Sequence, residues 1–310
     1  MKGQPAGIKK ASLIRRIATG AIFAIVVLTC LALGNTFMLL PLLCALLAIV
    51  GAEEFYRLTS PDMPLVPRII GLVTSAALPL AIYFASLELG DLSPILGTGG
   101  LRSTVALFYV IICALVGLMM WLALIRDPAT RSSSIGRSSM AYVANSLFGA
   151  LYLGVPFACL LLIRQMNEGS PLLAVALVIS VWAADSFAYF GGSLFGRHKI
   201  APQISPKKSW EGLIAGTLGS ILFWYLVPYI FQGEASFVGA VVVGSIVSLT
   251  ALVGDLFQSR LKRERGVKDS GKLLPGHGGI LDRIDSLLLT SPVMFVLLST
   301  LGVALGIVIH

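Results

Sequence analysis

Residues 259–285 read SRLKRERGVKDSGKLLPGHGGILDRID and form the longest polar run in a chain that is otherwise mostly apolar. Seven of these residues are basic and four are acidic, and the glycine-rich stretch 276–279 precedes the last two acids. Basic side chains beside flexible glycine backbone suit oligophosphates, and neighbouring acids suit a hard divalent cation. Because long apolar runs flank this stretch on both sides, it predicts a phosphate-handling segment at a membrane surface.

The composition indicates an integral membrane protein. Hydrophobic residues make up 56% of the 310 residues and charged residues only 12%, whereas soluble domains carry roughly 25% charged residues. The 32 glycines suit closely packed membrane helices. We therefore predict an all-α fold, a polytopic bundle in the lipid bilayer. The net charge of +8 follows the two sides of the membrane, so no nucleic-acid partner is expected.

Membrane-spanning helices need about 20 mostly apolar residues. We predict nine of them, and a count of eight or ten remains open. They lie at about 17–34, 36–52, 69–87, 104–125, 141–163, 172–195, 212–232, 237–257 and 287–309.

This reading divides the chain into two regions. Residues 1–170 form an N-terminal transmembrane region of about five spans, and the first span is expected to stay uncleaved because no cleavage signal ends it. Residues 171–310 form a C-terminal catalytic transmembrane region with cytoplasmic loops at 196–211 and 258–286.

The distribution of basic residues predicts the orientation. With the N-terminus in the cytoplasm, 21 of the 23 Lys and Arg residues fall on the cytoplasmic side, and only Arg102 and Arg164 do not. This agrees with the positive-inside rule. We predict a cytoplasmic N-terminus, an outside C-terminus and a site that faces the cytoplasm. Without a transit peptide, a bacterial inner membrane is favoured over an organelle.

Two acids lie within or at the end of predicted spans. Asp185 lies inside the sixth span, where a carboxylate costs several kcal/mol unless it faces a cavity, a cation or a partner. Asp255 ends the eighth span and would share a helix face with Ser259 and Lys262 if the helix continues. The alternative for Asp185 is a structural acid, hydrogen-bonded between helices.

Asp282 and Asp285 lie three residues apart at the start of the ninth span and point the same way. One of them could simply cap a helix N-terminus, but a cap does not need two acids. Because the eighth and ninth spans bracket the central loop, Asp255 can face this pair. Three like charges would repel, so we predict a bound cation. Oxygen ligands without a Cys/His set favour Mg²⁺.

A second basic cluster lies in 196–212, GRHKIAPQISPKKSWEG. Lys207 and Lys208 stand just before a helix that we expect to begin at 209–211. Phosphate binds well at a helix N-terminus with lysines beside it. The alternative is that these lysines only satisfy the positive-inside rule. The P-loop pattern is absent.

Two histidines have open roles. His277 could act as an acid or base near neutral pH, but we favour a hydrogen-bonding role in the loop. We interpret His198 as structural or interfacial.

The motif that carries the acids also resembles a family signature. Ser259, Lys262, Arg263, Lys268 and Asp269, followed by Leu273, His277-Gly278-Gly279 and Asp282-Arg283-Ile284-Asp285, resemble the signature of phosphatidate cytidylyltransferases, the CDP-diacylglycerol synthases. SPKKSWEG at 205–212 and the surroundings of Asp185 and Asp255 also resemble that family. The resemblance covers roughly the C-terminal 40% of the chain.

The resemblance implies a Mg²⁺-dependent nucleotidyltransferase of phospholipid biosynthesis. Its substrates would be CTP and phosphatidic acid, its products CDP-diacylglycerol and pyrophosphate, and its oligomeric state a homodimer. The resemblance leaves a second, monovalent cation open. Catalytic roles would fall to Asp255, Lys262, Arg263, Lys268, Asp282 and Asp285. Substrate binding would fall to Ser205, Lys207, Lys208, Ser209, Ser259, Asp269, His277 and Arg283. The metal would be held by Asp255, Asp282 and Asp285, with Asp185 in support.

Three other functional classes fit the sequence less well. A transporter of anionic solutes would suit an acid inside the membrane, but the charges gather on one side and no repeat appears. An alcohol phosphotransferase that consumes CDP-lipid would carry a D-G-x2-A-R pattern, which is absent. A structural scaffold would not need Asp255, Asp282 and Asp285 together.

Overall fold

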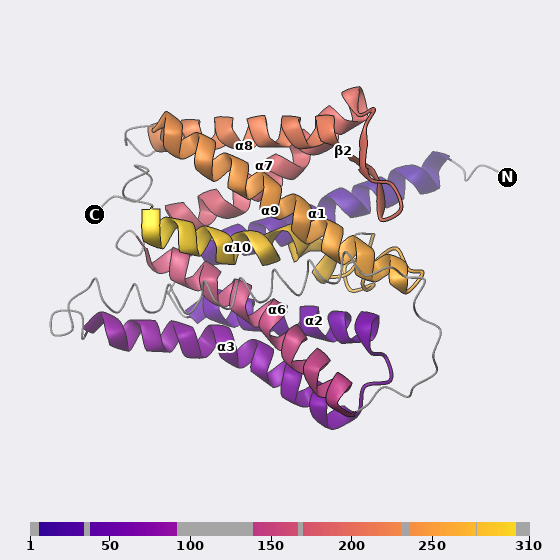
Figure 1. The fold of residues 1–310 in the computed structure, drawn as a ribbon, viewed down its shortest axis with the longest axis vertical. Coiled ribbons are helices and arrows are strands. Elements are labelled where there is room, and N and C mark those ends of the chain that lie inside the picture. The colour runs from indigo at the N-terminus through magenta and orange to yellow at the C-terminus, as the bar shows by residue number, and fades with distance from the viewer. Residues whose placement is uncertain are drawn as a thin grey trace.

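The computed structural model describes residues 6–33, 38–91, 139–166, 170–230, 236–276 and 278–301. Eight helices and two short strands make up this part of the chain (Figure 1). They are α1 (Ala6–Leu33), α2 (Leu39–Thr59), α3 (Leu65–Asp91), α6 (Ser139–Gln165), α7 (Leu172–Phe195), β1 (Lys199–Ala201), β2 (Ser205–Ser209), α8 (Trp210–Ile230), α9 (Phe237–Glu264) and α10 (Leu281–Leu301).

Seven of the described helices are long and apolar enough to cross a membrane, namely α2, α3 and α6 to α10, whereas the apolar part of α1, Ala18–Leu33, is shorter. The prediction of a polytopic helical membrane protein is therefore confirmed. The predicted span at 104–125 lies outside the described residues, so the count of nine stays a prediction.

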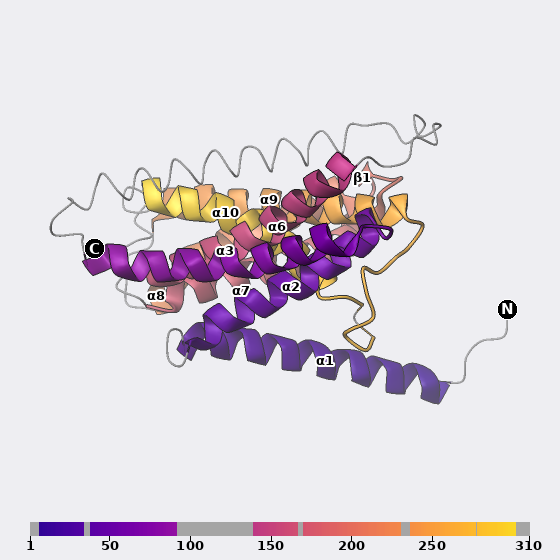
Figure 2. The same cartoon turned by 90° about the horizontal axis from the view of Figure 1, so that it is seen from below.

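The helices run lengthwise beside one another, and α1 lies along one side of the bundle (Figures 1 and 2). Three polar connections meet at the end of the bundle where α1 begins: the α2–α3 turn, the β1–β2 hairpin and the segment between α9 and α10. Helices α3 and α6 also begin at this end, where the Ser146 hydroxyl donates to the Pro67 carbonyl at 2.6 Å, so distant stretches of sequence meet there.

The loop predicted at 196–211 contains a short β-hairpin, which the all-α prediction did not include. Strands β1 and β2 pair antiparallel, with Lys199 opposite Ser209 and Ala201 opposite Ser205. The Trp210 N–H, the first of α8, donates to the His198 carbonyl at 3.0 Å. The expected helix start is therefore confirmed, and the hairpin is anchored directly to α8.

An aromatic cluster joins α2, α6 and α9. The ring centroids of Tyr152 and Phe257 lie 5.4 Å apart, and those of Phe55 and Tyr152 lie 5.5 Å apart. The Tyr56 hydroxyl donates to the Ser146 carbonyl at 2.7 Å, so this polar group is satisfied inside the core. The cluster packs helices from both halves of the chain into one core.

Helix α8 exposes an apolar stripe. Ile214, Leu218, Leu222 and Leu226 recur every fourth residue, and each is between 47% and 62% exposed. Residues spaced by four lie on one helix face. A continuous apolar face of this kind suits contact with lipid tails.

Glycines let pairs of helices approach closely. A Cβ placed on Gly254 of α9 would lie 2.5 Å from the backbone carbonyl oxygen of Asp285 in α10. A Cβ placed on Gly191 of α7 would collide with the Ala215 side chain of α8. Small residues at such crossings are the usual means of close packing in membranes.

We predict that Gly254→Ala lowers the free energy of unfolding by about 1–3 kcal/mol, because the added methyl group must push the α10 backbone away. Thermal unfolding in detergent measures this change. Val253→Ala is the control, because Val253 is 37% exposed on the outer side of the same helix turn. Equal melting temperatures for wild type and Gly254→Ala would contradict the close packing.

Candidate active site

Three acids from three helices approach one another near the polar end of the bundle. The Ser286 hydroxyl donates to Asp185 of α7 at 3.1 Å, and Ser286 directly follows Asp285 in α10. Gly254, the residue before Asp255, lies against the backbone of Asp285. Helices α7, α9 and α10 therefore bring Asp185, Asp255 and Asp285 to one region.

Lys208 of β2 reaches these acids from the hairpin. Its Nζ lies 2.7 Å from Asp255 Oδ2, and the two side chains are 22% and 23% exposed. Burial alone lowers the pKa of Lys208, but the charges of Asp255, Asp185 and Asp285 outweigh burial and raise the pKa above its ordinary value. Lys208 therefore stays a cation among three carboxyl groups.

The alternation of β2 separates the two neighbouring lysines. Lys208 is half-buried against Asp255, whereas Lys207 is exposed. Successive side chains of a strand point to opposite faces, so only one of the pair can face the acids. Ser209 is 3% exposed and its hydroxyl accepts from the Gly212 N–H at 3.2 Å, which makes it the N-cap of α8.

Asp282 forms a second ion pair, separate from the first. Its Oδ1 binds Lys262 Nζ at 2.7 Å, and the side chains of Lys262 and Asp282 are 12% and 5% exposed. Its Oδ2 accepts from the backbone N–H groups of Ser270 at 2.8 Å and Gly279 at 3.0 Å. The carboxylate thus ties α9, the α9–α10 segment and the first turn of α10 together.

This arrangement bears on the predicted metal ligands. Asp282 is engaged by Lys262 and two backbone groups, whereas Asp255 is paired with Lys208. Within the ranges that the structure describes, no three His, Cys, Asp or Glu side chains form a group that could hold a metal ion. The metal site stays a prediction.

Other predicted site residues lie around this centre. The Ser259 hydroxyl donates to Asp255 Oδ1 at 3.1 Å, because α9 continues to Glu264 and places both on one face. Arg263 Nε donates to the Ile204 carbonyl at 3.3 Å and so joins α9 to the hairpin turn. Ser205 is half-buried in β2, and His277 lies outside the described residues. The remaining predicted residues are exposed: Lys268, Asp269 and Arg283.

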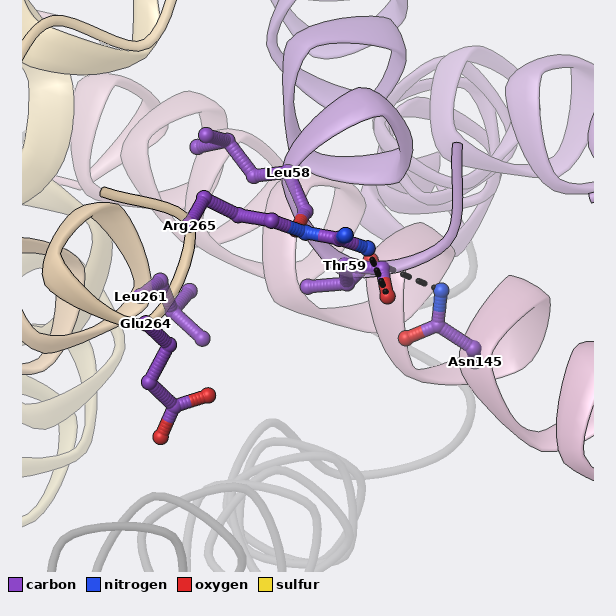
Figure 3. Close-up of a pocket in the computed structure, with 6 residues that line it drawn as sticks. All are labelled: Leu58, Thr59, Asn145, Leu261, Glu264 and Arg265. Atoms are coloured by element: carbon purple, nitrogen blue, oxygen red, sulfur yellow. Dashed lines mark hydrogen bonds between the residues drawn. The ribbon is translucent and has the colours of Figure 1, made fainter. Parts of the chain in front are cut away.

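Two cavities lie apart from the ion pairs. The larger, about 220 Å³, is lined by Leu58, Thr59, Asn145, Leu261, Glu264 and Arg265. In Figure 3, Arg265 reaches across to Thr59, whose carbonyl accepts from Arg265 Nη2 at 3.1 Å. The α9 residues that line this cavity lie on a different face of the helix from Asp255 and Lys262. The Arg265 hydrogen bond across it joins α9 to α2, away from the three acids.

The smaller cavity, about 50 Å³, lies among α1, α2, α6, α7 and α10. Apolar side chains such as Phe23, Leu47 and Trp182 line most of it, and Asp185, Arg283 and Ser286 provide its polar lining. The cavity is therefore mainly apolar, with Asp185 and Arg283 at its polar part.

Comparison with known proteins identifies the family. The model of the cytidylyltransferase family matches residues 14–301. The chain belongs to the cytidylyltransferase family. This confirms the resemblance that the motif between α9 and α10 predicted, and extends it to nearly the whole chain.

Three relatives carry the same name. The chain is 37% identical over 181 residues to a phosphatidate cytidylyltransferase of Thermotoga maritima, a match that covers 57% of this chain and 63% of that protein. A phosphatidate cytidylyltransferase of Rickettsia felis is 40% identical over 164 residues, which cover 51% of this chain and 70% of the relative. One from Mycobacterium bovis is 31% identical over 245 residues, 77% of this chain and 72% of the relative. The chain thus matches less than two thirds of the Thermotoga maritima protein's length.

Sequence reasoning missed Glu54 of α2, which is 7% exposed and accepts hydrogen bonds from the segment before α10. One signal could have found it: a carboxylate at the end of a long apolar run is costly unless a partner compensates it. The partners of Glu54 lie more than 200 positions away along the chain, so its neighbours in sequence do not indicate them.

We predict that Asp282→Ala lowers the free energy of unfolding by about 3–5 kcal/mol, because it leaves the buried ammonium of Lys262 without its partner. Chemical unfolding in detergent measures the loss. Asp269→Ala, which removes an exposed acid of the same segment, is the control and should be nearly neutral. Similar losses in both variants would argue against a special role of the Lys262–Asp282 pair.

Proposed function

We propose that this protein is a phosphatidate cytidylyltransferase that transfers CMP from CTP to phosphatidic acid in phospholipid biosynthesis. Membership of the cytidylyltransferase family supports the proposal, as do relatives that carry this name. The observation that carries it is Lys208 held among three acids at the polar end of a bundle with lipid-facing sides.

The reaction makes modest demands on proton transfer. A phosphate oxygen of phosphatidic acid attacks the α-phosphorus of CTP, the bond from that phosphorus to the α–β bridging oxygen breaks, and pyrophosphate leaves with the electron pair. Phosphatidic acid is an anion at neutral pH, so its oxygen needs no strong base. The protein must instead hold two polyanions together and stabilise the charge on the leaving group.

The basic residues of this end suit that task. Lys208 is a cation beside the acids, and Lys262 is fixed by Asp282. We assign both to substrate phosphates, with Arg263, Lys268 and Arg283 as further contacts on the exposed side. The small cavity beside Asp185 and Arg283, with its apolar lining, is compatible with part of an acyl chain.

The three acids around Lys208 have the ligand chemistry that suits Mg²⁺. Asp185, Asp255 and Asp285 offer carboxylate oxygens, the ligands that Mg²⁺ prefers, and Lys208 shows that a positive charge is stable among them. We propose these three as the metal-holding residues, and Asp282 as the residue that holds Lys262. Bound Mg²⁺ would neutralise phosphate charge. A second, monovalent cation is carried over from the family resemblance alone.

We further propose nine spans, a cytoplasmic N-terminus, an outside C-terminus and an active site on the cytoplasmic side of a bacterial inner membrane. The gathering of the hairpin and the α9–α10 segment at one end supports this orientation, since cytoplasmic connections carry the excess of Lys and Arg. A homodimer is carried over from the family resemblance alone.

The proposal predicts that membranes containing the protein, given labelled CTP, phosphatidic acid and Mg²⁺, produce lipid-extractable label. The label should vanish with EDTA, return with added Mg²⁺, and fall at least 100-fold in Asp285→Asn, because the variant loses a charged oxygen ligand. The control is Asp62→Asn, which changes an exposed acid of the α2–α3 turn. Solute flux without nucleotide use would instead support a transporter.

We predict that Lys208→Ala lowers kcat/KM by roughly 100-fold or more, because a charge that contacts the reacting phosphates is lost. Lys207→Ala, its exposed neighbour, is the matched control and should lower kcat/KM less than fivefold. Steady-state kinetics with purified protein in detergent, with melting temperatures in parallel, measure both. Equal losses would contradict the assignment of Lys208.

A further inference from the structure

Glu53 and Glu54 are adjacent acids of α2 that face different partners. Glu53 Oε1 accepts from Arg57 Nε at 2.7 Å, and Glu53 also pairs with Arg68 of α3. Glu54 is 7% exposed and contacts the segment between α9 and α10 instead. A carboxylate buried at this depth requires compensation by hydrogen-bond donors.

Glu54 receives that compensation from the start of α10 and from Ser270. Its Oε2 accepts from the Ser270 hydroxyl at 2.7 Å and from the Leu281 N–H at 2.9 Å. Its Oε1 accepts from the Ile280 N–H at 3.1 Å. The first N–H groups of a helix lack partners within the helix and favour a negative charge. Glu54 therefore caps α10 from a different helix.

The segment between α9 and α10 packs closely around the Glu54 carboxylate. A Cβ added at Gly271 or Gly279 would collide with the Glu54 carboxylate group. Any side chain at either position would displace the segment from Glu54. The two glycines therefore permit a contact that specifically surrounds the Glu54 carboxylate.

Ser270 connects Glu54 to the second ion pair. Its hydroxyl donates to Glu54, while its backbone N–H donates to Asp282 Oδ2 at 2.8 Å. Asp282 Oδ1 in turn binds Lys262 at 2.7 Å. The contacts run without a gap from Glu54 through Ser270 and Asp282 to the ammonium group of Lys262.

We propose that Glu54 is a positioning residue for the transfer reaction. It holds Ser270 and the start of α10 so that Asp282 presents Lys262 to a substrate phosphate. This inference rests on the proposed cytidylyltransferase function. It gives the N-terminal half a part in the site, because α2 supplies the group that orders the C-terminal motif.

The test compares Glu54→Gln with Glu53→Gln in the full chain in detergent. Glutamine keeps one acceptor oxygen but turns an NH₂ group towards backbone donors, so at least one N–H loses its partner. We expect kcat/KM to fall roughly 10- to 100-fold in Glu54→Gln, as for other residues that orient the groups in contact with the ligand. The KM for CTP or for phosphatidic acid should rise about tenfold, while Glu53→Gln changes either KM less than twofold.

The KM separates positioning from folding. A variant that merely unfolds in part loses kcat through a smaller active fraction and keeps both KM values, and that result would overturn the proposal. Ser270→Ala should raise the same KM, and the double variant should be no worse than Glu54→Gln, since both act through one chain of contacts. If Glu54→Gln fails to fold, an unchanged KM in Ser270→Ala overturns the proposal.

Limited proteolysis provides a readout independent of activity. Lys268 and Lys272 are exposed trypsin sites in the held segment, and Glu54→Gln should speed cleavage after them at least fivefold relative to wild type and Glu53→Gln. If wild-type protein forms no labelled lipid, the proposed function fails, whereas faster cleavage still reports the anchoring. Unchanged cleavage in a folded Glu54→Gln variant would overturn the anchoring itself.

Discussion

The neutralisation of carboxylates inside a membrane bundle is the constraint on which this structure depends. Asp185, Asp255 and Asp285 lie in helices apolar enough to span a bilayer, where an uncompensated charge costs several kcal/mol. Lys208 supplies compensation from the β1–β2 hairpin. The ion pair therefore joins the hairpin to α9.

A second ion pair orders the other connection. Asp282 accepts from Lys262 and from two backbone N–H groups, so one carboxylate fixes a side chain of α9 and the segment that leads to α10. Truncating one partner of such a pair strands a buried charge, although the pair itself contributes little net stability. Its value lies in geometry, because it holds an ammonium group in one place.

Close helix packing makes both pairs possible. Gly254 lets α9 approach the α10 backbone beside Asp255 and Asp285, and the aromatic cluster of α2, α6 and α9 holds the two halves of the chain in one core. Arg265 adds a contact from the end of α9 to the last carbonyls of α2. The N-terminal helices therefore support the geometry of the site and do more than span the membrane.

The sequence by itself determined the class of the protein and its family. Apolar runs of span length, the sided distribution of Lys and Arg, and the acids at 255, 282 and 285 are local features, and local features can be read without coordinates. The helix start at Trp210 also followed from a local pattern. The sequence left open whether the helix continues past Asp255, and the structure extends α9 to Glu264, into the predicted loop.

Only the tertiary structure decided which groups meet. Strand alternation and the hairpin register select Lys208 over Lys207, and the sequence shows two equivalent lysines. Asp282 pairs with Lys262 of a different helix, which distinguishes it from Asp255 and Asp285 although all three are acids near one loop. Glu54 meets Ser270 across 216 positions of sequence. Contacts of this kind depend on how helices pack, and packing is set by the whole chain at once.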